Sequence, residues 1–151
     1  MKAVRRAAVY AVFRMTLLPL RLMPLALGVP LAKILGQLGY LGFGRLRKRA
    51  VRQVAAVFGE ELPAREVKAL VRRTFEHYSL LYFEFVNSDR FLAARPDLFE
   101  VIGRENLDRA LQDGRGIIWL TGHVGNWEMM AIYISFVAGY KINIITRSLY
   151  D

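Results

Sequence analysis

One short run of residues combines side chains that can move a proton. His123 and Glu128 stand with four residues between them, and glycines occupy positions 122 and 125. A neutral imidazole can accept a proton from a hydroxyl group, and a nearby carboxylate can hold the imidazole in the required tautomer. Glycine lets backbone and substrate approach where a side chain would block them. The run 122–128 therefore predicts His123 as a general base with Glu128 as its partner, an arrangement suited to acyl transfer to an alcohol.

Each residue of this run also has a purely structural interpretation. Asn126 can cap the N-terminus of a helix, Glu128 can complement the dipole of the same helix, and Trp127 can belong to a core. We favour the catalytic interpretation because these residues occur together in one string. The other histidine, His77, lies within a helical pattern, and we interpret it as a structural or surface residue.

Several other classes of site find no support in the sequence. The chain has no cysteine, which excludes disulfides, thiolate zinc sites and a cysteine nucleophile. It also lacks a Gly-x-Ser-x-Gly elbow and a phosphate-binding Gly-Lys-Ser/Thr loop. No spacing defines a metal site around the two histidines, so we predict no metal.

The elements that must position the run 122–128 alternate between strand and helix patterns. We expect strands at Phe99–Ile102, Ile117–Thr121 and Ile142–Thr146, and helices at Glu105–Gln112 and Trp127–Val137. This alternation predicts an α/β fold that contains a β-α-β-α-β unit. His123 then follows the carboxyl end of a strand, where ligands collect in such sheets.

Helical patterns dominate the chain before this unit. Residues 45–58 read as a basic amphipathic helix, and residues 59–62 as a turn. Apolar residues at spacings of three and four then predict a long helix from Pro63 to Val86, with one face toward a core. We expect residues 91–97 to be irregular, because Pro96 interrupts them.

Positive charge is concentrated at the N-terminal end. Residues 1–59 contain eleven Lys or Arg and no Asp or Glu, whereas the rest of the chain contains eleven basic and thirteen acidic residues. A basic and apolar segment suits either an anionic membrane or nucleic acid. Leu, Met, Ala, Gly and Pro separate the charges here, which favours membrane lipid as the partner and not nucleic acid.

The same segment is close to the length needed to cross a bilayer. Residues 22–44 are almost entirely apolar, but Pro24 and Pro30 interrupt them and basic residues flank them on both sides. We expect interfacial or re-entrant helices on the cytoplasmic face, with a single span as the alternative. We accordingly predict a membrane-associating segment at 1–58 and the α/β part at 59–151.

Taken together, Gly114-Arg115-Gly116, the apolar run after it, residues 122–128 and Arg147 resemble the lipid A biosynthesis (lauroyl/myristoyl) acyltransferase family. This family belongs to the lysophospholipid acyltransferase-like superfamily and is marked by a histidine followed, after four residues, by an acidic residue. The resemblance implies an inner-membrane enzyme that moves a fatty acyl group to a hydroxyl of a lipid A-type glycolipid precursor. The acyl donor would be acyl carrier protein or acyl-CoA as co-substrate, with no further cofactor.

The resemblance also implies roles for individual residues. His123 would be the general base and Glu128 would orient it, while Arg147 suits a phosphate of a substrate. The other residues expected to bind substrate are Gly122, Gly125, Asn126 and Trp127. Family members are longer than this chain, so we expect it to be the N-terminal half of a larger acyltransferase domain. The alternatives are an acyltransferase acting on another lysophospholipid or envelope glycolipid, and a non-catalytic membrane-binding fragment.

Overall fold

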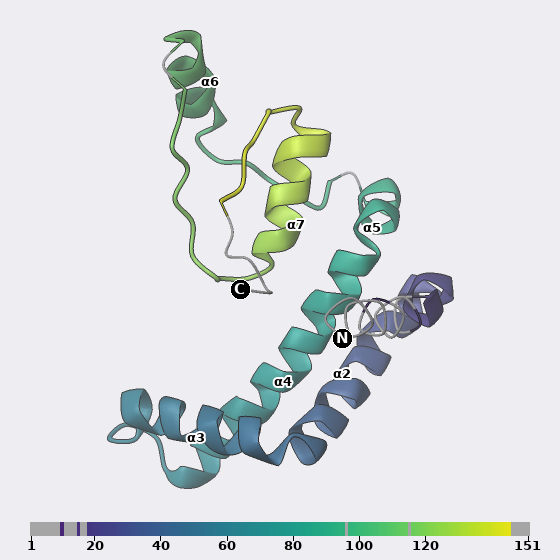
Figure 1. The fold of residues 1–151 in the computed structure, drawn as a ribbon, viewed down its shortest axis with the longest axis vertical. Coiled ribbons are helices and arrows are strands. Elements are labelled where there is room, and N and C mark those ends of the chain that lie inside the picture. The colour runs from purple at the N-terminus through teal and green to yellow at the C-terminus, as the bar shows by residue number, and fades with distance from the viewer. Residues whose placement is uncertain (1–9, 11–14, 16–17, 96, 115, 146–151) are drawn as a thin grey trace, which may run out of the picture. The chain divides into compact units, whose positions relative to one another are not determined.

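The computed structural model describes residues 10, 15, 18–95, 97–114 and 116–145. The chain divides into two compact units, residues 1–87 and residues 88–151. In the first unit residues 18–22 are helical, followed by α2 (Leu25–Gly42), α3 (Gly44–Phe58) and α4 (Ala64–Val86) (Figure 1). The second unit contains α5 (Ser88–Ala94), α6 (Arg104–Gln112), α7 (Trp127–Ile132) and the π-helix η1 (Tyr133–Val137).

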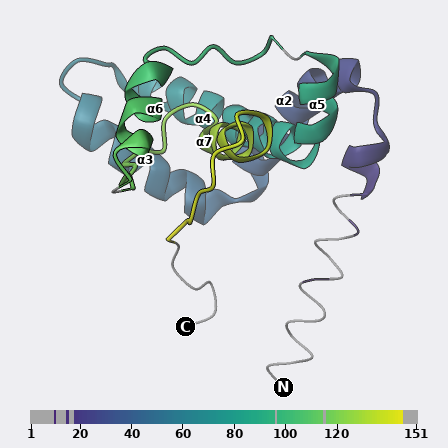
Figure 2. The ribbon, with the colours of Figure 1, turned by 90° about the horizontal axis from the view of Figure 1, so that it is seen from above.

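The first unit is built on a close contact between α2 and α4, which run side by side (Figures 1 and 2). Gly28, Ala32 and Gly36 are buried and four residues apart, so they share one face of α2. A Cβ atom at Gly28 would lie 1.9 Å from Cε1 of Phe83, and one at Gly36 would lie 2.4 Å from Cα of Glu76. The two helices are therefore antiparallel, and small residues allow their backbones to approach closely.

A buried asparagine closes the C-terminal end of α4. Asn87 has no exposed surface, and its Nδ2 donates to the carbonyl oxygens of Phe83 at 3.0 Å and Leu20 at 3.2 Å. Arg21 donates in turn to the carbonyl oxygen of Val86 at 3.0 Å. These hydrogen bonds attach the helical residues before α2 to the end of α4, where the carbonyl oxygen of Phe83 also accepts a hydrogen bond from the backbone N–H of Asn87.

Most of the predicted helices are confirmed. α3 and α4 match the helices expected to end at residues 58 and 86, α6 matches the one expected over 105–112, and α7 with η1 covers 127–137. Pro63 precedes α4 as its N-cap residue instead of opening the helix. The prediction of an irregular segment over 91–97 is wrong for its first half, because α5 extends to Ala94.

The predicted α/β fold is wrong. Within the described residues no strand forms over Phe99–Ile102, Ile117–Thr121 or Ile142–Thr146, the last residue of which lies outside them, and neither Figure 1 nor Figure 2 contains an arrow. Ile118 and Leu120 are each 89% exposed. A strand is held by hydrogen bonds to a neighbouring strand, and an apolar run predicts burial without specifying that neighbour. The two helices of the expected β-α-β-α-β unit form, but its three strands do not in the part of the chain that the structure describes.

One helix of the first unit bears on membrane association. By length and composition alone, α2 is long and apolar enough to cross a membrane, and it is the one such helix among the described residues. The structural division of the chain comes after Asn87. The boundary predicted at residue 58 concerns membrane association, which the fold does not test.

Candidate functional site

His123 lies in an exposed segment of the second unit, shortly before α7. Residues 116–126 have no regular secondary structure, and the side chain of His123 is exposed. Its ring meets the ring of Trp127 edge to face, with centroids 4.6 Å apart and an interplanar angle of 66°. Because Trp127 is the half-buried first residue of α7, this contact restricts the orientations of the imidazole while leaving it open to solvent.

The start of α7 is defined by two residues of the predicted run. Asn126 is the N-cap, and its side-chain oxygen accepts a hydrogen bond of 3.1 Å from the backbone N–H of Met129, which is buried. Gly125 has a φ of +59°, in the left-handed region that favours glycine. The chain therefore turns into α7 two residues after His123 by a route that depends on Gly125.

The structure does not join the two predicted catalytic residues. Glu128 lies exposed in the first turn of α7, and among the described residues no hydrogen bond or ion pair connects it with His123. Gly122 directly precedes His123, and a Cβ atom there would meet only a methyl group of Val124, at 3.8 Å. Arg147 lies outside the described residues.

A polar cluster that the sequence did not reveal links α6 to the segment after η1. The hydroxyl of Tyr140 donates to Asp108, and Nε of Arg104 donates to the same hydroxyl at 3.0 Å. The hydrogen bond to Asp108 is the main cause that raises the pKa of Tyr140 above its ordinary value. Tyr140 lies 36 residues from Arg104 and 32 from Asp108 along the chain, so nothing in the sequence indicated its contact with them. The spacing of four between Arg104 and Asp108, which suits an ion pair on one helix, was the one signal of this cluster in the sequence.

The exposure of His123 leaves its imidazole accessible to a substrate that arrives from solvent. Within the described ranges no group of three or more His, Asp or Glu side chains could hold a metal ion. An exposed imidazole with glycines on both sides can meet an incoming hydroxyl group and take its proton. His77 is exposed on α4, in the other unit.

Two hollows lie in the first unit, and neither is lined by a predicted site residue. One has a volume of about 460 Å³ and apolar walls that include Leu35 and Phe83. The other, about 590 Å³, is bordered by charged side chains. The sequence revealed the positive charge of this region but not that several of its residues enclose a space.

The chain matches one protein family along nearly its whole length. Residues 2–147 match the family described as bacterial lipid A biosynthesis acyltransferase. No curated protein and no solved structure matches the chain. The matched range includes both the basic N-terminal segment and the run 122–128.

Proposed function

Since the chain belongs to the bacterial lipid A biosynthesis acyltransferase family, we propose that it transfers a fatty acyl group from acyl carrier protein or acyl-CoA to a hydroxyl of a lipid A-type glycolipid precursor. The family membership confirms the predicted family and the predicted class of enzyme, an acyltransferase. We propose, in addition, the identity of the acyl donor and of the acceptor, and the residues that act on them.

His123 acts as the general base. A ring nitrogen takes the proton of the acceptor hydroxyl, and the oxygen attacks the carbonyl carbon of the donor thioester. The carbon–sulfur bond then breaks, and the imidazolium returns its proton to the leaving thiolate. Transfer is direct, without an acyl-enzyme. The exposure of His123 supports this role, because both substrates can reach the ring.

The neighbouring residues prepare His123 for this step. Glu128 stabilises the imidazolium and fixes its tautomer. The two side chains are not bonded to each other in the structure, but catalytic hydrogen bonds often tighten only when substrate binds. Trp127 contacts the imidazole ring, and Asn126 caps the start of α7. Gly122 and Gly125 leave room for the acceptor. Arg147 binds a phosphate of a substrate.

The first unit associates with the cytoplasmic face of the inner membrane. Exposed leucine and isoleucine side chains of α2, among them Leu27, Ile34 and Leu38, can enter the acyl-chain region. α4 packs along α2 and carries exposed Arg72 and half-buried Glu76. A spanning α2 would draw these charges into the hydrocarbon, which is costly. This packing supports helices that lie in the interface over helices that cross the bilayer.

The family match together with the exposed His123 carries the proposal. Its test measures transfer of labelled acyl groups from acyl carrier protein, and in parallel from acyl-CoA, to the glycolipid precursor by membranes that contain the protein. We expect His123→Ala to lower transfer by about 10²–10⁴-fold, the usual contribution of a general base. His77→Ala is the matched control, because it removes the other histidine, and it should leave transfer unchanged.

The same assay separates the alternatives. Full transfer by the His123→Ala variant would refute the mechanism. Transfer to a lysophospholipid but not to the glycolipid precursor would favour a different acceptor. Membrane binding with no transfer to any acceptor would favour a non-catalytic membrane-binding protein.

A further inference from the structure

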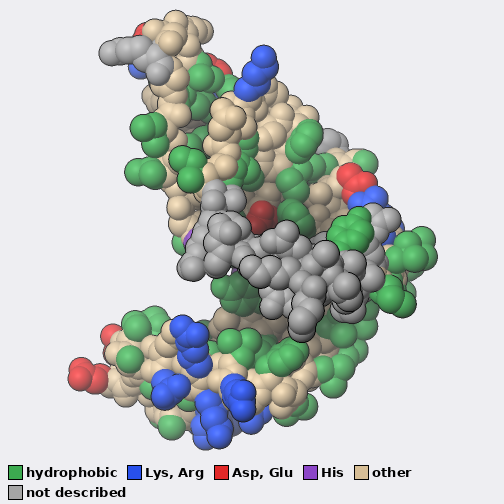
Figure 3. Space-filling view, viewed as in Figure 1, with side chains coloured by type: hydrophobic (Ala, Val, Ile, Leu, Met, Phe, Trp, Pro, Cys, Tyr) green, Lys and Arg blue, Asp and Glu red, His purple; other side chains and the backbone are tan. Residues whose placement is uncertain are grey.

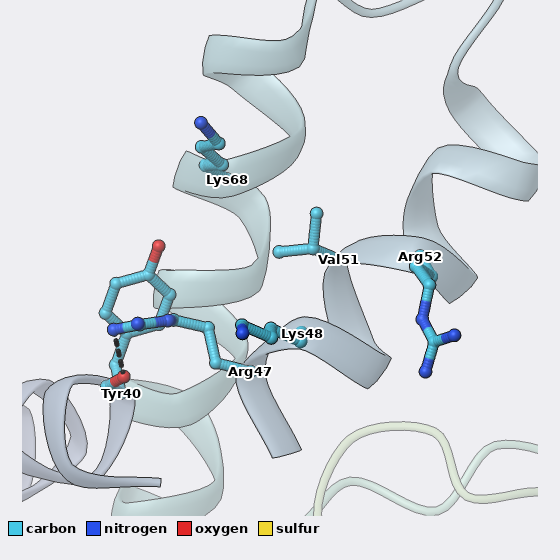
Figure 4. A pocket seen from close by; sticks show the side chains of 6 residues that line it. All are labelled: Tyr40, Arg47, Lys48, Val51, Arg52 and Lys68. Carbon is cyan, nitrogen blue, oxygen red and sulfur yellow. Dashed lines mark hydrogen bonds between the residues drawn. The ribbon is translucent and has the colours of Figure 1, made fainter. Parts of the chain in front are cut away.

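The charged hollow of the first unit is formed by three helices. It has a volume of about 590 Å³, and its lining residues come from the end of α2, from α3 and from α4: Tyr40, Arg47, Lys48, Val51, Arg52 and Lys68 (Figure 4). The lining includes four basic side chains and no acidic one. Such a space attracts an anion, because like charges around a concave surface reinforce one another's field.

One of these cations is held in place before any ligand arrives. Arg47 donates a hydrogen bond of 3.0 Å to the carbonyl oxygen of Tyr40, and its guanidinium lies 5.2 Å from the centre of the Tyr40 ring. The Tyr40 ring in turn meets Phe75 of α4 edge to face, with centroids 5.7 Å apart. Figure 4 shows the Arg47 side chain crossing the Tyr40 ring, with Lys68 projecting from α4. Arg47 therefore loses little conformational freedom when it binds an anion.

The remaining cations are available to a ligand. Among the described residues no carboxylate forms an ion pair with Lys48, Arg52 or Lys68. All three are exposed. In Figure 4 the side chain of Arg52 points away from Tyr40, so its charge lies farther from the Tyr40 ring than the charge of Arg47 does. Arg47, Lys48 and Lys68 thus line a hollow suited to an anion with several oxygen atoms, such as a phosphate, with Lys68 standing apart from the other two in Figure 4.

Large apolar side chains lie beside these cations along the chain. Leu41 is 66% exposed, Phe43 65% and Leu46 54%, and they occupy the positions between Tyr40 and Arg47. Figure 3 shows Lys and Arg side chains gathered among hydrophobic ones over α3. Cations that border exposed apolar residues match the layered structure of a membrane surface, where headgroup phosphates lie directly above acyl chains.

We propose that this hollow is a binding site for the phosphate group of an anionic membrane lipid. Arg47, Lys48 and Lys68 bind the phosphate oxygens, and Leu41, Phe43 and Leu46 contact the upper part of the acyl chains. The site belongs to the first unit and is additional to the His123 site of the second. Free phosphate has the same oxygen chemistry, but it would make no use of the apolar border.

The test compares two variants with the same change in charge. Lys48→Gln combined with Lys68→Gln removes two cations of the hollow. Arg49→Gln combined with Arg65→Gln removes two exposed cations of the same two helices that do not line it. Binding of the full chain is measured by sedimentation with vesicles of phosphatidylcholine alone and of phosphatidylcholine with phosphatidic acid. The readout does not depend on acyl transfer, so it stands apart from the test of His123.

We expect the hollow variant to bind phosphatidic acid vesicles about 30-fold more weakly than the unchanged protein, the factor for two lost lysine–lipid contacts. The control variant should lose about threefold or less at an ionic strength that screens diffuse charge. Equal losses in the two variants would overturn the proposal, since they would indicate a general basic surface. Circular dichroism of both variants should match that of the unchanged protein, because the replaced side chains are exposed.

Two further measurements separate lipid from other anions. If inorganic phosphate displaces the vesicles much more strongly than sodium chloride of equal ionic strength, free phosphate is the ligand and the lipid proposal is wrong. If the hollow variant keeps its vesicle binding but no longer binds acyl carrier protein, the hollow is a docking site for a protein, and the lipid proposal is again wrong.

Discussion

Replacing Gly36 by alanine tests the contact that holds the first unit together. The added Cβ atom would lie 2.4 Å from Cα of Glu76, 2.7 Å from its backbone nitrogen and 2.8 Å from the carbonyl oxygen of Phe75. Real Cβ atoms essentially never lie within 3.0 Å of such neighbours, so the closest contact is 0.6 Å too short. All three neighbouring atoms belong to the backbone and cannot rotate away. The substitution must therefore move α2 away from α4.

The size of the effect follows from two opposing contributions. In a helix without neighbours, Gly→Ala stabilises by about 1 kcal/mol. Forcing an extra carbon into a packed interface costs about 1–3 kcal/mol, and a gap of about 0.5–1 Å loses a quarter to a half of the dispersion energy at the contacts beside it. Buried Ala32 and Gly28 lie on the same face and lose contacts too. We expect a net loss of about 1–2 kcal/mol of unfolding free energy.

Unfolding in detergent micelles, followed by circular dichroism, measures this loss as a lower midpoint temperature. The shift should be about 2–4 °C for each kcal/mol in a chain of this size. Gly42→Ala and Gly39→Ala are matched controls on the same helix. A Cβ atom at Gly42 meets nothing within 4 Å, and one at Gly39 has its nearest neighbour at 3.5 Å. Both controls should equal or exceed the stability of the unchanged protein. A Gly36→Ala variant as stable as these controls would refute the close packing.

Three further substitutions test other parts of the structure. Asn87→Ala should lower the free energy of unfolding by about 1–3 kcal/mol, because it leaves the carbonyl oxygen of Leu20 without this donor and empties the space of a fully buried side chain. Tyr140→Phe should weaken the link to α6, measured as faster amide hydrogen exchange there. Because the pKa of Tyr140 is raised by its hydrogen bond to Asp108, the link should persist below the ordinary pKa of tyrosine and be lost as pH rises through the raised value. Gly125→Ala should strain the start of α7 by about 1–2 kcal/mol, because φ there is +59°, and should speed amide exchange in the first turn of that helix.

Each of these substitutions has a control of the same kind. Ser88→Ala changes the residue next to Asn87, Tyr78→Phe removes the hydroxyl of an exposed tyrosine, and Gly122→Ala adds a methyl group where the nearest heavy atom is 3.8 Å away. These changes should have small effects. A control that changes stability or amide exchange as much as the substitution it accompanies would refute the hydrogen bond or the backbone strain assigned at that position.

Local patterns in the sequence predicted the helices well. The periodic apolar residues of α4 and the charged amphipathic pattern of α3 are visible without knowledge of any other part of the chain. The N-cap at Asn126 was foreseen as the structural interpretation of that residue, because a cap depends on only the next few residues. The run 122–128 also pointed to an acyltransferase family, which the family match confirms.

Contacts between distant residues decided the rest. The apolar runs at 117–121 and 142–146 predict strands, but a strand needs a neighbouring strand, which composition does not specify. The burial of Asn87 depends on the carbonyl of Leu20, far away along the chain. The hollow beside Tyr40 exists only because α3 and α4 approach the end of α2. The sequence by itself determined most of the helices, because they depend on short runs of residues, and the family, because its pattern extends over residues 2–147. The local backbone path into α7 decided that His123 contacts Trp127. Tertiary structure alone decided that Tyr140 meets Arg104 and Asp108, because they lie 36 and 32 residues away along the chain.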